Sequence, residues 1–266
     1  MADPIRARST RAAATPLVPH GEPPAYFTFS SLTALGLPHA TTTRHCPGTG
    51  PQPGPAPFTA ETARALAPAG LDLARVGFGR QVHQASVARV GEGGGFAGKA
   101  DGLVTTARRV PLAIFAADCL ALLLYDPEAA VLGATHAGWR GTARAVAPAT
   151  VAAMIALGAR AERIRVAISP SIGPCCYEVD APVIAALSSA YPDAWERWVT
   201  AGRSGHWMLD LWAANEVQLE RAGVPGGHVE NARRCTACHP DELYSYRKYS
   251  LGADAKGRLA TLAALP

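Results

Sequence analysis

Apolar positions gather in short runs through the middle of the chain, and polar or turn-forming residues separate these runs. The runs are 110–117, 120–125, 130–136 and 164–168. Apolar runs of this length, bounded by turn residues, are typical of strands that are buried on both faces. A stretch with alternating polarity and β-branched residues at 77–90 predicts another strand, which ends at the glycines of 91–95.

Longer segments with helical patterns lie between these runs. They predict helices over 61–67, 142–157, 183–190 and 211–222. Pro148 is expected to break or kink the second helix early, Asp210 to cap the last helix and Gly223 to close it. Strands and helices mix without a strict βαβ rhythm. The pattern therefore predicts an α/β (α+β) fold, a layered sandwich of mixed β-sheets forming a single domain over 25–266.

The two Pro-rich segments predict irregular structure. Residues 1–24 are rich in Ala, Arg and Pro and lack the apolar stretch of a secretory signal, so we expect a disordered leader and a cytoplasmic protein. Residues 45–57 form a Pro/Gly loop. The longest apolar runs are far shorter than the roughly 20 residues that span a bilayer, so no membrane partner is expected.

Composition and charge narrow the class of protein. The chain has 266 residues, of which 48% are hydrophobic and 17% charged, as expected for a globular protein with a substantial core. The formal net charge is +4, but Arg6, Arg8 and Arg11 lie in the leader. Since no basic stripe is interleaved with aromatic residues elsewhere, nucleic acid is not an expected partner. No pattern predicts an oligomeric state.

The six cysteines are expected to be reduced. They are Cys46, Cys119, Cys175, Cys176, Cys235 and Cys238. The length of the chain and the missing export signal argue against a disulfide framework, and the adjacent pair is awkward for ordinary disulfide geometry. The thiols are therefore candidates for metal binding or catalysis.

Three residues at the ends of predicted strands are candidate ligands of one metal ion: His83, Cys119 and His136. A catalytic zinc needs about three His, Cys or carboxylate ligands and an open position. The spacings are too wide for a finger-like structural site, so only the fold can bring the three together. The alternative is a buried, inert cysteine and two hydrogen-bonded histidines.

Two other interpretations use the same residue types. Cys235 to His239 matches the CxxCH pattern of covalent haem attachment, which ordinarily requires export; a pair of buried thiols in a turn explains it equally well. A cysteine hydrolase would use Cys119 as nucleophile and His136 or His83 as base, without a metal.

A succession of motifs along the chain points to one family. The motifs are QVH (81–83), KADGLVT (99–105), ADC (117–119), HAGWRGT (136–142), IGPCCYEVD (172–180), DLWAANEVQL (210–219), CTAC (235–238) and YSYR (244–247). Over about 26–265 the chain closely resembles the zinc-dependent purine nucleoside phosphorylases, also described as the multicopper polyphenol oxidase or laccase-like domain family. HAGWRGT with IGPCCYEV at this separation is highly specific.

The resemblance implies a cofactor and an activity. It implies zinc bound by His83, Cys119 and His136, and phosphorolysis of adenosine, inosine and methylthioadenosine to the free base and ribose 1-phosphate. Adenosine deamination occurs in similar proteins. Purine nucleosides and phosphate are thus the expected partners. Copper is an alternative or adventitious metal, but a multicopper oxidase is disfavoured because the chain has no His-x-His pair.

Charged and polar residues in the same motifs are candidates for the remaining chemistry. Asp118 is a candidate for proton transfer or for support of the adjacent Cys119. Arg44, Arg140 and Arg247 are candidates for binding phosphate or nucleoside hydroxyls, because a guanidinium offers a bidentate fork to such oxygens. Gln81 is a candidate for orienting the substrate through its amide.

One segment departs from the family. After the TTR segment the family usually has a stretch like Gly-Gly-Val-Ser, whereas this chain has HCPGTGPQPGPAPFT. The departure removes the basis for assigning substrate contacts to this loop, and it bears on the role of Arg44. Cys46 is an extra thiol here and a candidate for a fourth, adventitious metal ligand.

Overall fold

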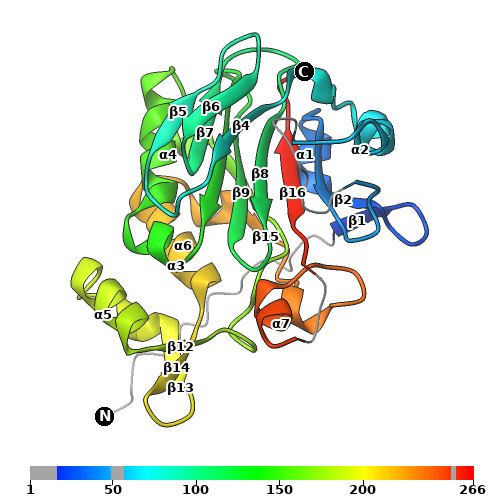
Figure 1. Cartoon of the computed structure of the whole chain (residues 1–266). Coiled ribbons are helices and arrows are strands. Elements are labelled where there is room, and N and C mark those ends of the chain that lie inside the picture. The colour runs from blue at the N-terminus through cyan, green and yellow to red at the C-terminus, as the bar shows by residue number, and fades with distance from the viewer. Residues whose placement is uncertain (1–16, 49–56, 253–255) are drawn as a thin grey trace.

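Two large β-sheets form the centre of the computed structural model, which describes residues 17–48, 57–252 and 256–266 (Figure 1). The first has seven strands in the order β1-β2-β3-β16-β8-β4-β6. Their bounds are β1 Leu17–His20, β2 Tyr26–Phe29, β3 His39–Thr42, β16 Leu259–Ala263, β8 Leu112–Ala116, β4 Gly77–Arg80 and β6 Gly95–Lys99. Most pairs in this sheet are antiparallel, but β4 runs parallel to β6 and β8.

The second large sheet has six strands in the order β15-β11-β9-β10-β7-β5. Their bounds are β15 Val229–Asn231, β11 Arg165–Ile168, β9 Leu120–Asp126, β10 Val131–Ala137, β7 Gly102–Thr105 and β5 Val87–Arg89. A small sheet contains β12 Glu178–Asp180, β14 His206–Leu209 and β13 Val199–Ala201. Parallel and antiparallel pairs occur together, so the predicted mixed sheets are confirmed.

Seven α-helices accompany the sheets in the described part of the chain. They are α1 Ser30–Ala34, α2 Ala60–Leu66, α3 Trp139–Ala143, α4 Val146–Ala156, α5 Ala181–Ala190, α6 Leu211–Arg221 and α7 Tyr246–Ser250. None of them has the length and apolar character needed to cross a bilayer. The predicted cap is confirmed, because the Asp210 side chain accepts a hydrogen bond from the Ala213 N–H at the start of α6.

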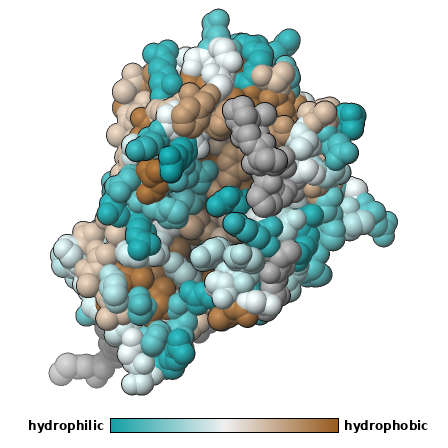
Figure 2. Space-filling model, in the orientation of Figure 1, coloured by the Kyte–Doolittle hydropathy of each residue, from teal (hydrophilic) through white to brown (hydrophobic). Residues whose placement is uncertain are grey.

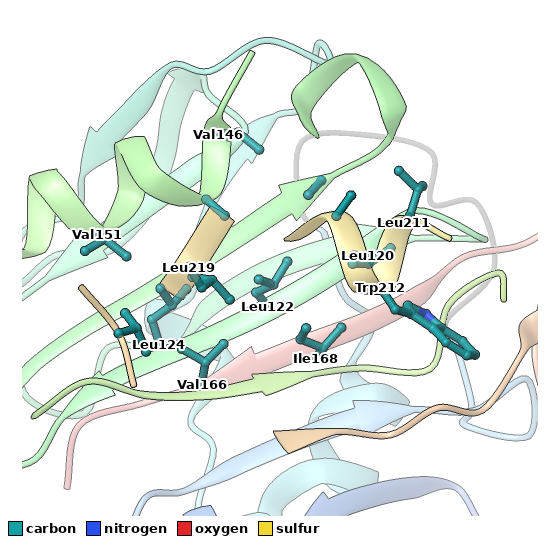
Figure 3. Close-up of a cluster of buried hydrophobic side chains, with 14 of the residues drawn as sticks. Leu120, Leu122, Leu124, Val146, Val151, Val166, Ile168, Leu211, Trp212 and Leu219 are labelled. Carbon is teal, nitrogen blue, oxygen red and sulfur yellow. The ribbon is translucent and has the colours of Figure 1, made fainter. Parts of the chain in front are cut away.

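The environment of strand β9 explains why its apolar run is continuous: side chains on both of its faces are buried. Leu122 and Leu124 point toward α4 and α6 and pack with Leu219 (Figure 3). Leu123, between them, points the other way and packs with Ile114 of the seven-stranded sheet. Since successive side chains of a strand point to opposite faces, both faces of β9 are buried. The sheets therefore pack face to face with helices outside them, which confirms the predicted layered α/β sandwich.

Two elements differ from the prediction. The single strand expected over 77–90 is wrong: β4 and β5 belong to different sheets, and a turn separates them. The single helix over 142–157 is also wrong, because α3 and α4 are separated at Ala145, which has a φ of 60°. Pro148 causes no break, since it lies in the first turn of α4, where its missing N–H has no helical acceptor.

The leader predicted over 1–24 is wrong in its last part. Leu17–His20 forms β1, which pairs antiparallel with β2, and the His20 ring stacks on Tyr26 at 4.5 Å. Such cross-strand pairs order an edge strand. Residues 1–16 and 49–56 lie outside the described residues. That 25–266 forms a single catalytic domain stays a prediction.

Candidate metal centre and substrate pocket

Three predicted ligands lie together at one end of the two sheets. His83 lies in the turn between β4 and β5, Cys119 in the connection from β8 to β9, and His136 near the end of β10. Each offers one donor atom within 4.8 Å of the others, and the two imidazole rings meet edge to face with centroids 4.9 Å apart. The fold thus brings together residues that are far apart in the sequence, as the metal-site interpretation requires.

The buried carboxylate of Asp101 orients His136. Asp101 is fully buried, and its Oδ1 accepts a hydrogen bond from Nδ1–H of His136 at 2.9 Å. Because a carboxylate is only an acceptor, Nδ1 of His136 carries a proton, and Nε2 is the ring nitrogen left to bind a metal once it has lost its own proton. A metal-binding histidine typically has this arrangement. Asp101 is not among the site residues predicted from the sequence, although it lies within the KADGLVT motif.

The same carboxylate also builds the turn that presents His83. Asp101 Oδ2 accepts hydrogen bonds from the N–H groups of Val82 (3.1 Å) and Gln84 (2.9 Å), and Oδ1 accepts one from His83 N–H (2.9 Å). His83 has a φ of 59°, a conformation that non-glycine residues rarely adopt. These hydrogen bonds stabilise the turn, which is why the apolar pattern of 77–90 does not continue as one strand.

The charges at the centre favour a thiolate. Burial raises the pKa of Cys119, but hydrogen bonds and charges of His136 and His83 outweigh burial and lower it to about 7. Burial lowers the pKa of His136, but the hydrogen bonds of Asp101 and Cys119 raise it to about 9. Cys119 is therefore substantially ionised at neutral pH, and the thiolate is the form that binds metals.

This ionisation predicts the pH dependence of Cys119 alkylation in the metal-free chain. Thiolate reacts and thiol does not, so the rate of iodoacetamide modification should rise with pH and reach half its maximum at about pH 7. Peptide mass spectrometry would measure it site by site. Cys175 is the internal control, because burial and neighbouring thiols raise its pKa to about 11. A midpoint near the ordinary thiol value for Cys119 would contradict the expectation.

Gly138 allows the close approach of the ligands. A Cβ atom at this position would lie 2.7 Å from Cys119 Sγ and 3.3 Å from Cδ2 of His83. The first of these distances is shorter than real contacts of a Cβ atom, so a larger residue would displace the thiolate. The glycine of HAGWRGT therefore has a steric role next to the candidate centre.

The three ligands line one side of a pocket of about 620 Å³. Figure 2 shows a hollow over β8, with hydrophobic atoms in its depth. Aromatic side chains of Phe58, Phe115 and Tyr246 line it, and Lys256 and Arg258 bring positive charge to it. The volume lies within the range of about 300–1,000 Å³ that is usual for small-molecule sites. The pocket therefore combines metal-ligating, aromatic and cationic side chains.

Asp118 supports the ligand loop through two hydrogen bonds. Its Oδ1 accepts from the Thr236 hydroxyl and its Oδ2 from the Arg247 N–H, both at 2.6 Å. The residue is buried and has a φ of 90°, which sets the direction of the chain into Cys119. These contacts favour a positioning role over proton transfer.

Gln81 lines the pocket, but its amide group is paired with the main chain. Its Nε2 donates to the Phe115 carbonyl at 2.6 Å, and its Oε1 accepts from the Phe115 N–H at 2.8 Å. This side chain therefore extends the pairing of β4 with β8 and fixes the wall that carries Phe115.

The three predicted arginines are not among the residues that line this pocket. Arg44 donates to the Pro240 carbonyl and lies over the Tyr244 ring. Arg140 is exposed and stacks on its neighbour Trp139, with the guanidinium carbon 4.1 Å from the ring centroid. Arg247 donates to the Glu178 carbonyl at 2.8 Å. The cations at the pocket are instead Lys256 and Arg258, which lie outside the quoted motifs.

Cys46 is not an additional ligand of this centre. It is buried with Leu66 and Leu262 in a hydrophobic cluster on the outer side of the seven-stranded sheet. Burial raises the pKa of its thiol to about 11, and among the described residues Cys46 belongs to neither candidate metal cluster. None of the six cysteines is part of a disulfide.

The fold and this centre define a layered α/β protein with a candidate mononuclear metal site that opens onto a small-molecule pocket. The chain belongs to the family described as multi-copper polyphenol oxidoreductase laccase, which matches residues 54–266. The resemblance found in the motifs is thus confirmed.

Relatives and solved structures agree with this membership. A protein named purine nucleoside phosphorylase from Deinococcus radiodurans is 39% identical over 245 residues, which cover 87% of this chain and 90% of that protein. A protein named adenosine deaminase RL5, from an unknown prokaryotic organism, is 33% identical over 58% of each chain. The crystal structure of YlmD from Geobacillus stearothermophilus is 29% identical and covers 94% of this chain and 99% of that one, with a TM-score of 0.80.

Proposed function

We propose that this chain is a zinc-dependent purine nucleoside phosphorylase, which converts adenosine, inosine or methylthioadenosine and phosphate to the free base and a ribose 1-phosphate. The observation that carries the proposal is that the three candidate metal ligands, His83, Cys119 and His136, line a pocket with aromatic and cationic side chains. The name of the Deinococcus radiodurans relative supports the same activity.

The donor set fits zinc. One thiolate and two imidazoles are ordinary zinc ligands, and three protein ligands leave a fourth position for substrate or water. All three ligands line the pocket, so an ion that they held would be next to the space for the substrate. When bound, zinc would supply a Lewis acid that polarises an oxygen atom of a reactant.

The residues of the pocket have separate tasks in this proposal. Phe58, Phe115 and Tyr246 provide apolar faces against which a purine ring can stack. Lys256 and Arg258 bind the phosphate anion and hold it against the sugar, where positive charge develops as the glycosidic bond breaks. Asp118 and Gln81 keep the ligand loop and the pocket wall in place through their main-chain hydrogen bonds.

The alternatives differ in their metal requirement and product. A multicopper oxidase needs several histidine-rich copper sites, and in the described part of the chain the only other candidate metal cluster consists of cysteines. A cysteine hydrolase would need no metal. Deamination of adenosine is the second candidate function, because a relative at 33% identity is named adenosine deaminase RL5.

The test is an assay of the purified, zinc-loaded chain with each nucleoside, with and without inorganic phosphate. Phosphorolysis predicts release of base that depends on phosphate, with an equal amount of ribose 1-phosphate, as resolved by chromatography. Base release that ignores phosphate would overturn the proposal. Conversion of adenosine to inosine without base release would assign the site to deamination instead.

Replacing Arg258 with glutamine should raise the KM for phosphate by roughly tenfold or more, because a charge-assisted hydrogen bond contributes about 1.5–3 kcal/mol. The KM for the nucleoside should change less. Initial rates at varied phosphate would measure both constants. Arg197→Gln is the matched control, since Arg197 is exposed and lies in the segment Trp195–Trp198, away from the residues that line the pocket. An unchanged phosphate KM in Arg258→Gln would contradict the assignment.

A further inference from the structure

A second cluster of metal-ligating side chains lies outside the pocket and contains the CTAC segment. Cys175 and Cys176 lie between β11 and β12, and Cys235 and Cys238 lie between β15 and α7. The four Sγ atoms all lie within 4.8 Å of one another. Neither the haem pattern nor the proposed reaction accounts for this convergence of two distant segments.

The spacing of the sulfur atoms suits one tetrahedral ion. Cys238 Sγ lies 3.5 Å from Cys175 Sγ and 3.4 Å from Cys176 Sγ. A Zn–S bond of about 2.3 Å places tetrahedral sulfur ligands about 3.8 Å apart. A disulfide would need about 2.05 Å, so these thiols converge without being joined in pairs.

Main-chain contacts fix the two cysteine segments against each other. The Gly173 N–H donates to Cys235 Sγ at 3.3 Å, a contact that favours the thiolate over the thiol. Ser171 pairs with Cys235 in a parallel bridge, and the Thr236 N–H donates to the Ser171 carbonyl at 3.2 Å. The ligands are therefore held in place by the backbone, as a structural metal site requires.

We propose that Cys175, Cys176, Cys235 and Cys238 bind one structural zinc ion, separate from the metal of the pocket. Four thiolates form a closed, soft ligand set typical of structural zinc. Cys175 and Cys238 are exposed, so the ion enters from solvent, and the thiol protons that it displaces pass to solvent.

This ion would also connect to the pocket. Thr236, inside the CTAC segment, donates its hydroxyl hydrogen to Asp118, which directly precedes the ligand Cys119. By tying the two cysteine segments together, the structural zinc holds Thr236 in the position from which it supports the ligand loop.

Native mass spectrometry of the full chain, loaded with zinc under reducing conditions and then desalted, tests the inference. We expect two zinc ions per chain in the wild type. Cys235→Ser/Cys238→Ser should keep one, and His83→Ala/His136→Ala should also keep one. Cys46→Ala is the matched control and should keep two, because Cys46 lies in neither cluster. A Cys235→Ser/Cys238→Ser chain that keeps as many zinc ions as the wild type would overturn the inference.

The wild-type chain alone provides a second measurement if the cysteine variant does not fold. Loading with cobalt(II) should give thiolate-to-cobalt charge-transfer absorption that keeps increasing up to two equivalents of cobalt per chain. Absorption that saturates at the intensity of a single thiolate–cobalt bond would overturn the inference, because the pocket cluster has one thiolate and the other cluster has four. A wild-type chain that binds only one zinc, and whose protein mass is two hydrogen masses below that of the reduced chain, would also overturn the inference. The missing hydrogens would show that the cluster contains a disulfide.

Discussion

Replacing His83 or His136 with alanine is expected to lower kcat for the proposed nucleoside phosphorolysis by about 10³-fold. Each substitution removes one of three candidate donors, and the two that remain would bind the proposed zinc too weakly to keep it at the reacting atoms. Loss of several kcal/mol of transition-state stabilisation corresponds to this factor, since about 1.4 kcal/mol is tenfold in rate. Steady-state kinetics on zinc-loaded protein, with the metal content measured on the same samples, gives both results.

The zinc content should fall by one ion per chain in either variant, while the fold persists. His83 lies in a surface turn, so its loss leaves the sheets intact. His206→Ala is the matched control: His206 lies on β14 in the small sheet and is not part of a candidate metal cluster. Full activity and undiminished zinc in His83→Ala would refute the metal centre. Loss of zinc with full activity would favour chemistry that needs no metal.

The layers could be predicted because apolar runs leave local signals in the sequence, whereas the candidate ligands were singled out mainly by the resemblance of their motifs, since their spacing alone left an inert cysteine as the alternative. The apolar runs of β8, β9 and β10 show strands buried on both faces, and the ligands lie at the ends of such strands or between them. The turn around His83 could not be predicted in this way. It depends on Asp101, a residue 18 positions away in the chain, and its positive φ has no signal in hydrophobic periodicity.

The arginines show a second limit of motif-based assignment. A long, charged side chain can point in many directions, and its partner depends on packing between distant segments. Arg247 reaches the Glu178 carbonyl across the fold, although its motif alone was compatible with phosphate binding. Lys256 and Arg258 line the pocket because the chain approaches β16 beside it. Only the tertiary structure distinguishes a structural guanidinium from a cation at the pocket.

Asp101 is the residue outside the ligand set whose replacement should affect the centre most. Each of its carboxylate oxygens accepts two hydrogen bonds, and the whole group is buried. In Asp101→Asn one oxygen becomes an NH2 group. Facing Val82 and Gln84, that group would oppose two N–H donors. Facing His136, it would donate to Nδ1 and move the imidazole proton to Nε2, which then could not bind zinc.

We therefore expect Asp101→Asn to weaken zinc binding in the pocket by about 10–100-fold, the usual cost of losing a partner that orients a ligand. The free energy of unfolding of the metal-free chain should fall by about 1–3 kcal/mol, because buried donors lose their acceptor. Competition with a chromophoric chelator measures the affinity, and urea denaturation measures the stability.

Asp126→Asn is the matched control for separating metal binding from stability. Asp126 is equally buried, and each of its oxygens also accepts two hydrogen bonds, from Glu128, Ala129, Arg160 and Arg163, away from the pocket. It should lose similar stability and keep the zinc affinity of the wild type. Equal loss of affinity in both variants would show that Asp101 acts through general stability alone.

The loss of folding stability at acidic pH gives an independent test of the role of the Asp101 carboxylate. Burial raises the pKa of Asp101, but the hydrogen bonds from His136 and from the 82–84 turn outweigh burial and lower it. Because the folded-state pKa is below that of the unfolded chain, the carboxylate stabilises the fold at pH values above about 4 and loses this effect as the pH falls further. Asp101→Asn has no such group to protonate, so its stability should decline less steeply below about pH 4 than that of the wild type. If the stability of Asp101→Asn falls as steeply below pH 4 as that of the wild type, Asp101 is not ionised in the folded chain. His136 would then lack the carboxylate acceptor that holds its Nδ1 proton and leaves Nε2 for zinc.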